Sequence, residues 1–174
     1  MIVWLGGTYG AGKTTTAREL TALLPGARVF DTEEVGAVLQ GILRDQWPGN
    51  FQHWPMWRGL VVETARQVLA YTGGTLVVPQ TVLSERYWDE IETGFRAAGI
   101  PVRHFVLHAD EATLRTRIAG DEAPESATAG PWRLRHLDEY ARALEWLRTR
   151  ATVIDTASLT PAGTAARIAR AVAA

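Results

Sequence analysis

The chain has 174 residues, of which 47% are hydrophobic and 21% are charged, and its formal net charge is −1. This length and composition suit one domain with a substantial core, and the small net charge without a basic stripe predicts no binding to nucleic acid. The chain contains no cysteine, which excludes disulfides, thiolate metal sites and cysteine catalysis.

The sequence carries no segment that predicts export or membrane insertion. Glycines interrupt the apolar residues 2–5 before a signal-peptide core can form. No run approaches the roughly 20 continuous apolar residues that are needed to cross a bilayer. We therefore expect a cytoplasmic protein without stable membrane association, present as a monomer or a homodimer.

Short β-type runs alternate with segments of helical periodicity along the whole chain. The expected strands are at 2–5, 27–31, 73–81, 101–109 and 151–156. The expected helices are at 13–24, after a capping Thr32, at 55–71, after a capping Ser84, at 110–118, at 133–150 and in the alanine-rich segment at the end. This alternation predicts an α/β fold, in which a five-stranded parallel sheet carries helices on both faces. We expect residues 1–174 to form a single domain.

Two segments interrupt the alternation and are rich in turn-forming residues. One is 44–58, which begins "RDQWPGNFQHWP", and the other is 119–133, which contains "AGDEAPESATAGPW". Ligands bind at the carboxyl ends of the strands in open parallel sheets, and both segments can fold over that edge. We predict that 44–58 is a substrate lid and that 119–133 is a nucleotide lid.

Residues 7–14, "GTYGAGKT", fit the Walker A pattern G-x-x-x-x-G-K-[ST] between a strand and a helix. The glycines let successive backbone N–H groups turn toward a β-phosphate, and the N-terminus of the next helix favours the same anion. We expect Lys13 to reach the β- and γ-phosphates and Thr14 to bind Mg²⁺. The alternative is a plain glycine turn. The residues expected to bind the nucleoside triphosphate here are Gly7, Thr8, Tyr9, Gly10, Ala11, Gly12, Lys13, Thr14 and Thr15.

A kinase also needs a carboxylate near the transferred phosphoryl group. Asp31 ends the second expected strand, so it can act as a catalytic base or hold Mg²⁺ through water. The alternative is that Asp31 caps the following helix. Glu33 is more simply interpreted as a favourable charge at that helix N-terminus. The third strand ends "LVVPQT" without an acid, which disfavours a motor-type ATPase.

The first insert and the end of the third strand hold the expected acceptor site. Aromatic rings there offer flat surface for a base, a sugar or an alkyl chain, and polar side chains offer anchors. The candidate substrate-binding residues are Asp31, Phe51, Gln52, Trp54, Trp57, Arg58, Gln80 and Thr81. Core packing is the alternative for Trp57, which matches the apolar period of its helix.

Arginines flank the second insert, at 115, 117, 133 and 135. A lid that closes over a nucleotide brings such cations to the phosphates and excludes water. The alternative for each of them is a solvated surface position.

Several stretches resemble the tunicamycin-resistance protein family, a branch of the small P-loop kinases that includes shikimate, gluconate and chloramphenicol kinases. They are "IVWLGGTYGAGKTTTAREL", "VFDTEEVGAVL", "FQHWPMWRGL", "GGTLVVPQTV", "VRHFVLHADEATLRTRI" and "VIDTASLTP". The patterns F-Q-x-x-P-x-W-R and V-P-x-T are far more specific than the Walker motif. The resemblance implies a P-loop fold, ATP binding and resistance to tunicamycin, a uracil-containing, fatty-acylated nucleoside antibiotic.

The resemblance also implies roles for single residues. In the wider kinase group, the aspartate after the second strand is often the base or metal partner, and Asp31 matches it. The arginine of L-x-x-R-[IL] commonly stacks on adenine, and Arg117 matches it. The I-D-T loop before the last helix lies near adenine, which implies roles for Asp155, Thr156 and Ala157.

One position departs from the pattern of these kinases. They often place a second lid arginine four residues after the stacking one, where this sequence has Asp121. The resemblance therefore leaves Arg133 or Arg135 as the catalytic lid cation.

Three functions follow from these observations. The first is an ATP- and Mg²⁺-dependent phosphotransferase that modifies a hydroxyl of tunicamycin or a similar nucleoside antibiotic, with Lys13 and Thr14 at the phosphates and Asp31 at the acceptor. The second is an ATP-binding protein that sequesters the antibiotic without modifying it. The third is a small-molecule kinase of metabolism.

Overall fold

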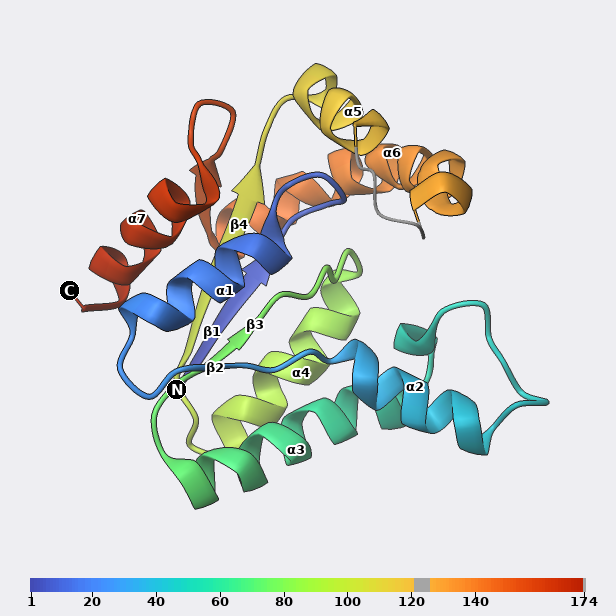
Figure 1. The fold of residues 1–174 in the computed structure, drawn as a ribbon. Coiled ribbons are helices and arrows are strands. Elements are labelled where there is room, and N and C mark those ends of the chain that lie inside the picture. Colours follow the sequence, from blue (N-terminus) through green and yellow to red (C-terminus); the bar gives the residue numbers. More distant parts are fainter. Residues whose placement is uncertain (121–125, 174) are drawn as a thin grey trace.

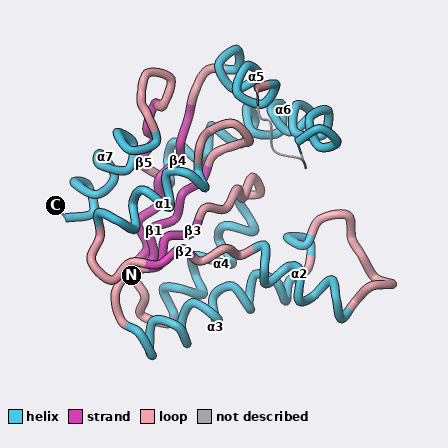
Figure 2. Tube along the Cα trace, in the orientation of Figure 1, coloured by secondary structure: helices cyan, strands magenta, loops and turns pink. Residues whose placement is uncertain are grey.

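The computed structural model describes the backbone of residues 1–120 and 126–173, and the side chains of 1–120, 133–134 and 136–173. Its five-stranded sheet is parallel, as predicted, and has the order β2-β3-β1-β4-β5 (Figure 2). The strands are β1 (Ile2–Gly6), β2 (Arg28–Val29), β3 (Leu76–Val78), β4 (Val102–His108) and β5 (Thr152–Asp155).

Helices cover both faces of the sheet, which confirms the predicted fold class. The helices are α1 (Lys13–Leu23), α2 (Glu33–Ile42), the short 3₁₀ helix η1 (Phe51–His53), α3 (Pro55–Thr72), α4 (Glu85–Ala97), α5 (Glu111–Ala119), α6 (Ser126–Arg150) and α7 (Pro161–Ala173). Figure 1 shows α1 and α7 on one side of the strands and α3 and α4 on the other.

The central strand β1 is buried on both faces, as its continuous apolar run predicts. Val3 and Leu5 belong to the core beneath α1 and α7. Ile2 and Trp4 belong to the core beneath α3 and α4. All four residues have no exposed surface, because successive side chains of a strand point to opposite faces.

The helix starts follow partly from capping residues. Pro55 occupies the first turn of α3, and the Ser84 hydroxyl accepts a hydrogen bond from the Tyr87 N–H at the start of α4. At α2 the expected cap is wrong, since no side-chain bond comes from Thr32. The Thr32 hydroxyl instead donates to Oε1 of Gln80, and Asp31 Oδ1 accepts the Glu33 N–H at 2.9 Å.

The second insert differs from the prediction. Helix α6 begins at Ser126 rather than at Arg133, so most of the expected lid segment 119–133 is helical. Gly130 and Pro131 do not stop this helix, and its first turns also contain alanine, the residue with the highest helix propensity. The expected lid also includes 121–125, with Asp121, which lie outside the described residues.

Candidate active site

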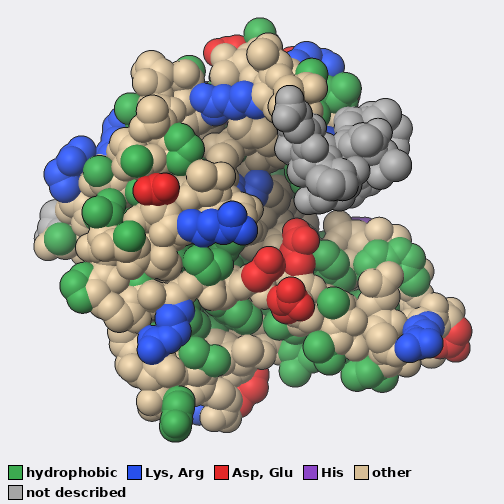
Figure 3. Space-filling model, viewed as in Figure 1, with side chains coloured by type: hydrophobic (Ala, Val, Ile, Leu, Met, Phe, Trp, Pro, Cys, Tyr) green, Lys and Arg blue, Asp and Glu red, His purple; other side chains and the backbone are tan. Residues whose placement is uncertain are grey.

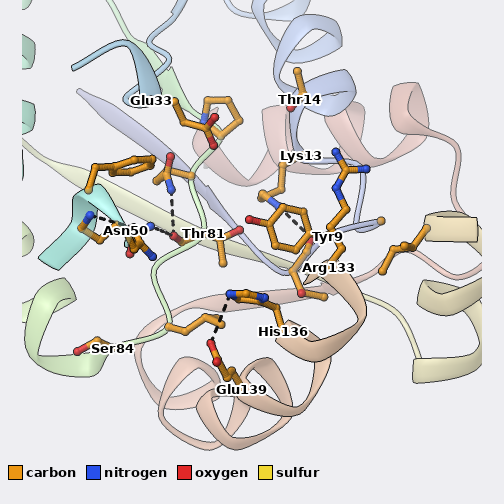
Figure 4. Close-up of a pocket in the computed structure, with 18 of the residues that line it drawn as sticks. Tyr9, Lys13, Thr14, Glu33, Asn50, Thr81, Ser84, Arg133, His136 and Glu139 are labelled. Atoms are coloured by element: carbon orange, nitrogen blue, oxygen red, sulfur yellow. Dashed lines mark hydrogen bonds and ion pairs between the residues drawn. The ribbon is translucent and has the colours of Figure 1, made fainter. Parts of the chain in front are cut away.

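A cleft with a volume of about 950 Å³ opens at the carboxyl end of the sheet. Its walls come from the loop after β1, the start of α2, the η1 segment, the loop after β3, and the facing sides of α5 and α6 (Figure 4). This position is the edge at which the sequence predicted ligand binding.

The Walker A loop forms one end of the cleft. Gly7, Gly10 and Gly12 have φ values of 125°, 75° and 87°, which are left-handed values that glycine adopts without strain. A Cβ atom at Gly7 would lie 2.4 Å from the Leu107 carbonyl oxygen, so no larger residue fits there. No side chain caps α1, and the N–H groups of a first helical turn lack intrahelical partners. They are therefore available to an anion.

Lys13 lies at the same end of the cleft. Its Nζ donates to the Thr8 carbonyl oxygen at 2.9 Å and lies 5.6 Å from the centre of the Tyr9 ring. Burial lowers the pKa of Lys13 to about 8, although the charge of Glu33 opposes this shift. An anion bound on the loop would stabilise the charged ammonium.

Glu33, the first residue of α2, lines the cleft together with Lys13 (Figure 4). Its side chain is exposed at the mouth of the cleft, yet the surrounding walls remove enough water to raise its pKa. The nearby charge of Asp31 raises this pKa further, and Lys13 lowers it. Sequence reasoning did not place Glu33 in the site. The sequence did contain a signal for this position. Side chains in the first turn of a helix point back toward its N-terminus, and the N-terminus of α2 lies at the carboxyl edge of the sheet.

Asp31 is exposed and is not among the residues that line the cleft. Its carboxylate holds the first turn of α2, which is the capping alternative. Figure 3 shows acidic side chains gathered over the start of α2, beside the hollowed part of this face. The geometry therefore brings Glu33, and not Asp31, into the cleft with Lys13.

The donors available for Mg²⁺ are oxygen atoms, which this ion prefers. Thr14 is exposed at the start of α1 and lines the cleft, as does Glu33. Among the residues that the structure describes, no group of three or more carboxylates or histidines could hold a metal by itself. A magnesium ion here would need phosphate oxygens and water as its other ligands.

The far end of the cleft has an aromatic and polar wall. Its lining includes Trp47, Asn50, Phe51, Gln52, His53, Gln80, Thr81, Ser84 and Tyr87. Four substrate-binding candidates of the sequence, Phe51, Gln52, Gln80 and Thr81, line the cleft, and their contact with a substrate stays a prediction. Asn50, Ser84 and Tyr87 were missed, because their places depend on how the segment around η1 packs against the loop after β3.

Two aromatic candidates lie behind this wall rather than in it. Trp57 has no exposed surface, and its Nε1 donates to the Thr32 carbonyl at 3.0 Å. Trp54 is 7% exposed. They pack edgewise or tilted against the lining residues, Trp54 on Trp47 and Trp57 on Phe51. Core packing, the alternative for Trp57, is confirmed.

Arg58 is also placed differently from the prediction. It is 3% exposed, its Nε donates to Glu90 Oε2 at 2.5 Å, and its guanidinium also donates to the Gln52 carbonyl. The same group lies 4.2 Å from the centre of the Tyr87 ring. With these partners, Arg58 supports the aromatic and polar wall from behind and is not among the residues that line the cleft.

Arg117 connects the phosphate loop to the loop after β5. Its guanidinium donates to the Thr156 carbonyl at 2.8 Å and to the Gly10 carbonyl at 3.4 Å. Thr156 is buried and its N–H donates to the His108 carbonyl at 2.7 Å. Asp155 and Ala157 are exposed, and the Ala157 N–H donates a hydrogen bond to Asp155 Oδ1 at 2.9 Å. The adenine site expected at these residues stays a prediction.

One face of α6 closes the cleft. Arg133, His136 and Glu139 all line it (Figure 4). The Arg133 guanidinium lies 5.6 Å from the centre of the Tyr9 ring, and His136 Nε2 lies 3.8 Å from Glu139 Oε2. Sequence reasoning missed His136 and Glu139, although their spacing of three from Arg133 places them on its face.

Tyr9 completes this end of the cleft. The Tyr9 ring packs edgewise against His136, and burial raises the pKa of Tyr9 to about 12. The side chain of Arg135, the other expected lid cation, lies outside the described residues.

Comparison with known proteins places this geometry in a family. A family model described as an AAA domain matches residues 2–147. Among solved structures, the tunicamycin resistance protein of Deinococcus radiodurans is 30% identical, with a TM-score of 0.78, and the match covers 98% of this chain and 94% of that chain. Comparison with curated proteins gave no match.

More distant structures share the fold. A sugar kinase from Janibacter is 18% identical with a TM-score of 0.67, and the match covers 99% of this chain and 94% of that chain. The deoxyadenosine kinase of M. mycoides is 16% identical with a TM-score of 0.55, and the match covers 99% of this chain and 98% of that chain. Within the described part of the chain, no helix has both the length and the apolar character needed to span a membrane.

Proposed function

The chain belongs to the P-loop AAA domain family and is related to the tunicamycin resistance protein, and we propose that it is an ATP-dependent phosphotransferase acting on a hydroxyl of tunicamycin or a similar nucleoside antibiotic. The observation that carries this proposal is the composition of one cleft. It combines the phosphate loop, the carboxylate of Glu33, and a wall of aromatic, amide and hydroxyl groups. A nucleotide and an uncharged acceptor can therefore meet within it.

Glu33 is the proposed catalytic base. Its raised pKa suits a carboxylate that must accept a proton. Glu33 takes the proton of the acceptor hydroxyl, whose oxygen forms a bond to the γ-phosphorus. The bond between this phosphorus and the β–γ bridging oxygen breaks, and ADP leaves with that electron pair.

The basic residues stabilise the charge that develops on the phosphates. Lys13 and the N–H groups at the start of α1 hold the β- and γ-phosphates, and the Thr14 hydroxyl would hold Mg²⁺ together with phosphate oxygens and water. When bound, the ion neutralises phosphate charge. Arg133 is the proposed lid cation, because it faces the cleft from α6. Arg135 stays a second candidate for this role.

Mass spectrometry of tunicamycin incubated with the protein, ATP and Mg²⁺ tests the proposal. We expect the drug to gain one phosphoryl group. Glu33→Gln should lower the transfer rate by about 100-fold, the lower range for loss of a general base, and should leave ATP affinity within about twofold of wild type.

Asp31→Asn is the matched control, because Asp31 lies two residues away and outside the cleft lining. We expect it to lower the rate by less than about tenfold, as loss of a helix cap does not remove the base. Tight binding of tunicamycin with unchanged mass would contradict transfer and would favour sequestration. Equal losses in both variants would contradict the role of Glu33.

A further inference from the structure

A hydrogen bond joins the phosphate loop to the loop that follows β3. The Thr81 hydroxyl donates to the Gly7 carbonyl oxygen at 2.5 Å, although the two residues are 74 positions apart in the sequence. The bond is possible because β1 and β3 are neighbouring parallel strands whose ends meet at the same edge. It lies at the wall of the cleft, since Thr81 lines it.

The Gly7 peptide is restrained from two directions. On one side, the backbone of Leu107 in β4 approaches so closely that a Cβ atom would not fit. On the other side, Thr81 holds the carbonyl oxygen. A peptide group is planar, so a fixed Gly7 carbonyl also fixes the direction of the Thr8 N–H. The start of the phosphate loop therefore takes its orientation from Thr81.

Thr81 is also connected to the aromatic and polar wall of the cleft, which we call the acceptor wall because the proposed function places the acceptor there. Its carbonyl oxygen accepts the side-chain amide of Gln52 at 2.7 Å and that of Gln80 at 3.1 Å; Figure 4 draws bonds that converge on Thr81. Gln52 is itself held through its N–H, which donates to Asn50 Oδ1 at 2.9 Å, and through its carbonyl, which Arg58 binds. A continuous set of hydrogen bonds thus runs from α3 through η1 to the phosphate loop.

We propose that Thr81 is a positioning residue for nucleotide binding, and that the side chain of Gln52 acts through it. The Thr81 hydroxyl holds the phosphate loop in the form that accepts the phosphates, and the Gln52 amide holds Thr81. A ligand that contacts the acceptor wall thereby affects the affinity for ATP. The effect of a ligand at the acceptor wall rests on the proposed function. The effect of Thr81 on nucleotide affinity rests only on its bond to the phosphate loop.

The bond has the features of a specific positioning contact. Thr81 follows a strand end with no acid, where the polar groups of Gln80 are already engaged with Thr32 and Thr81. Valine has nearly the shape of threonine, so Thr81→Val removes the hydroxyl and leaves the Gly7 carbonyl without this donor. Loss of one such bond changes an equilibrium by a few-fold to about tenfold.

Calorimetry with a non-hydrolysable ATP analogue and Mg²⁺ tests the first half of the proposal. We expect Thr81→Val to weaken binding by about tenfold and Thr81→Ser, which keeps the hydroxyl, to bind within about twofold of wild type. Thr72→Val is the matched control, because the Thr72 hydroxyl also bonds to backbone carbonyls, at 2.9 and 3.1 Å, but at an exposed helix end. It should leave the affinity unchanged.

A double-mutant cycle tests the second half. Gln52→Leu should weaken binding of the analogue by about threefold, and the double variant with Thr81→Val should bind no more weakly than Thr81→Val alone. Affinity losses that multiply would overturn the dependence of Gln52 on Thr81. Thr81→Ser as weak as Thr81→Val, or Thr81→Val within twofold of wild type, would overturn the role of the hydroxyl.

Thermal unfolding of each nucleotide-free variant separates positioning from folding. We expect Thr81→Val to lose affinity while its melting temperature stays close to that of Thr72→Val. If the loss of ATP-analogue affinity in Thr81→Val is fully explained by its fraction of unfolded protein, the proposal is contradicted. If Thr81→Val does not fold, the affinities of Gln52→Leu and Thr81→Ser for the analogue decide the question. If the double-mutant cycle gives the expected affinities but tunicamycin gains no phosphoryl group, the proposed transfer is refuted and this inference stands.

Discussion

At the scale of single residues, the fold buries the positively charged side chain of Lys13 in the cleft, where the nucleotide-free protein stabilises this charge poorly. Burial lowers the pKa of Lys13 to about 8. A base whose pKa falls on folding contributes stability above its unfolded pKa, and this contribution is lost as the pH falls through the folded value. Near neutral pH the charged Lys13 therefore destabilises the nucleotide-free fold, and phosphate binding offsets the loss.

Substitution of Lys13 tests this cost. Lys13→Met should raise the free energy of unfolding of the nucleotide-free protein by on the order of 1–2 kcal/mol, which is less than the full shift because the side chain is partly exposed. It should also abolish the stabilisation that ATP and Mg²⁺ give. Arg18→Met, at an exposed position of the same helix, should do neither in denaturant titrations. A less stable nucleotide-free Lys13→Met protein would contradict the argument.

His104 predicts a second dependence on pH. It packs on Trp88 with ring centres 4.0 Å apart, and burial, with a smaller contribution from Arg150, lowers its pKa to about 3. The stability that neutral His104 contributes is present above the unfolded pKa of 6.5 and is lost as the pH falls from there toward 3.

His104→Leu should therefore reduce the loss of stability between neutral and acid pH by roughly 2 kcal/mol, measured by urea unfolding across that range. His53→Leu serves as the control, since His53 is exposed at the mouth of the cleft and its ring forms a hydrogen bond with the Tyr87 hydroxyl. Parallel stability curves for wild type and His104→Leu would contradict the assignment.

The chemical role of a residue was harder to predict from the sequence than its position in the fold. The Walker A loop needed only a local motif, and the structure places it between β1 and α1 as expected, while nucleotide binding by its single residues stays a prediction. Asp31 and Glu33 are two positions apart, and the sequence favoured Asp31 as the base and gave Glu33 only a role at the helix N-terminus. A bond from the Glu33 N–H turns Asp31 toward the helix and leaves Glu33 in the cleft. The choice depends on a cap geometry that several residue types can form.

At the scale of elements, α3, η1 and α4 form one unit that supports the acceptor wall. Arg58 is its centre, as it joins Glu90 of α4 to the backbone of η1. The sequence predicted α3 and α4 from their apolar periods, because this signal is local. It did not predict that Arg58 is buried, because the burial is created by α4 and η1, which lie on opposite sides of α3 in the sequence.

Two arginines that share one carboxylate test this unit. Arg58→Leu should destabilise the protein by about 2–4 kcal/mol, since it leaves the Gln52 carbonyl and Glu90 without their buried donor. Arg86, which is 76% exposed and lies 3.3 Å from the same Glu90, is the control, and Arg86→Leu should change stability by less than about 0.5 kcal/mol. Similar losses in the two variants, measured by thermal unfolding, would contradict a structural role specific to Arg58.

The elements also show where composition misleads. The segment before Arg133 contains glycine and proline and was expected to be irregular, but α6 runs from Ser126. This start places Arg133, His136 and Glu139 within a continuous helix, and they share the face that closes the cleft. The helix expected from Arg133 already contained these three residues, and the earlier start places Arg133 inside the helix rather than at its first position.

At the scale of the whole molecule, the strand order brings the site together. β1 lies between β3 and β4, so the phosphate loop after β1 has Thr81 on one side and the backbone of β4 on the other. The chain order alone does not give this arrangement, although parallel α/β folds favour a site at the point where the strand order reverses. The oligomeric state, monomer or homodimer, stays a prediction.

The central claim is that one cleft holds ATP and the antibiotic together so that a phosphoryl group can pass between them. A crystal structure with tunicamycin, Mg²⁺ and a non-hydrolysable ATP analogue tests it most directly. The account predicts the γ-phosphate at Lys13, the drug against the wall of Trp47 and Phe51, and a drug hydroxyl between the γ-phosphorus and the Glu33 carboxylate. A drug molecule bound outside the cleft, or inside it with every hydroxyl turned away from the γ-phosphorus, would contradict the account.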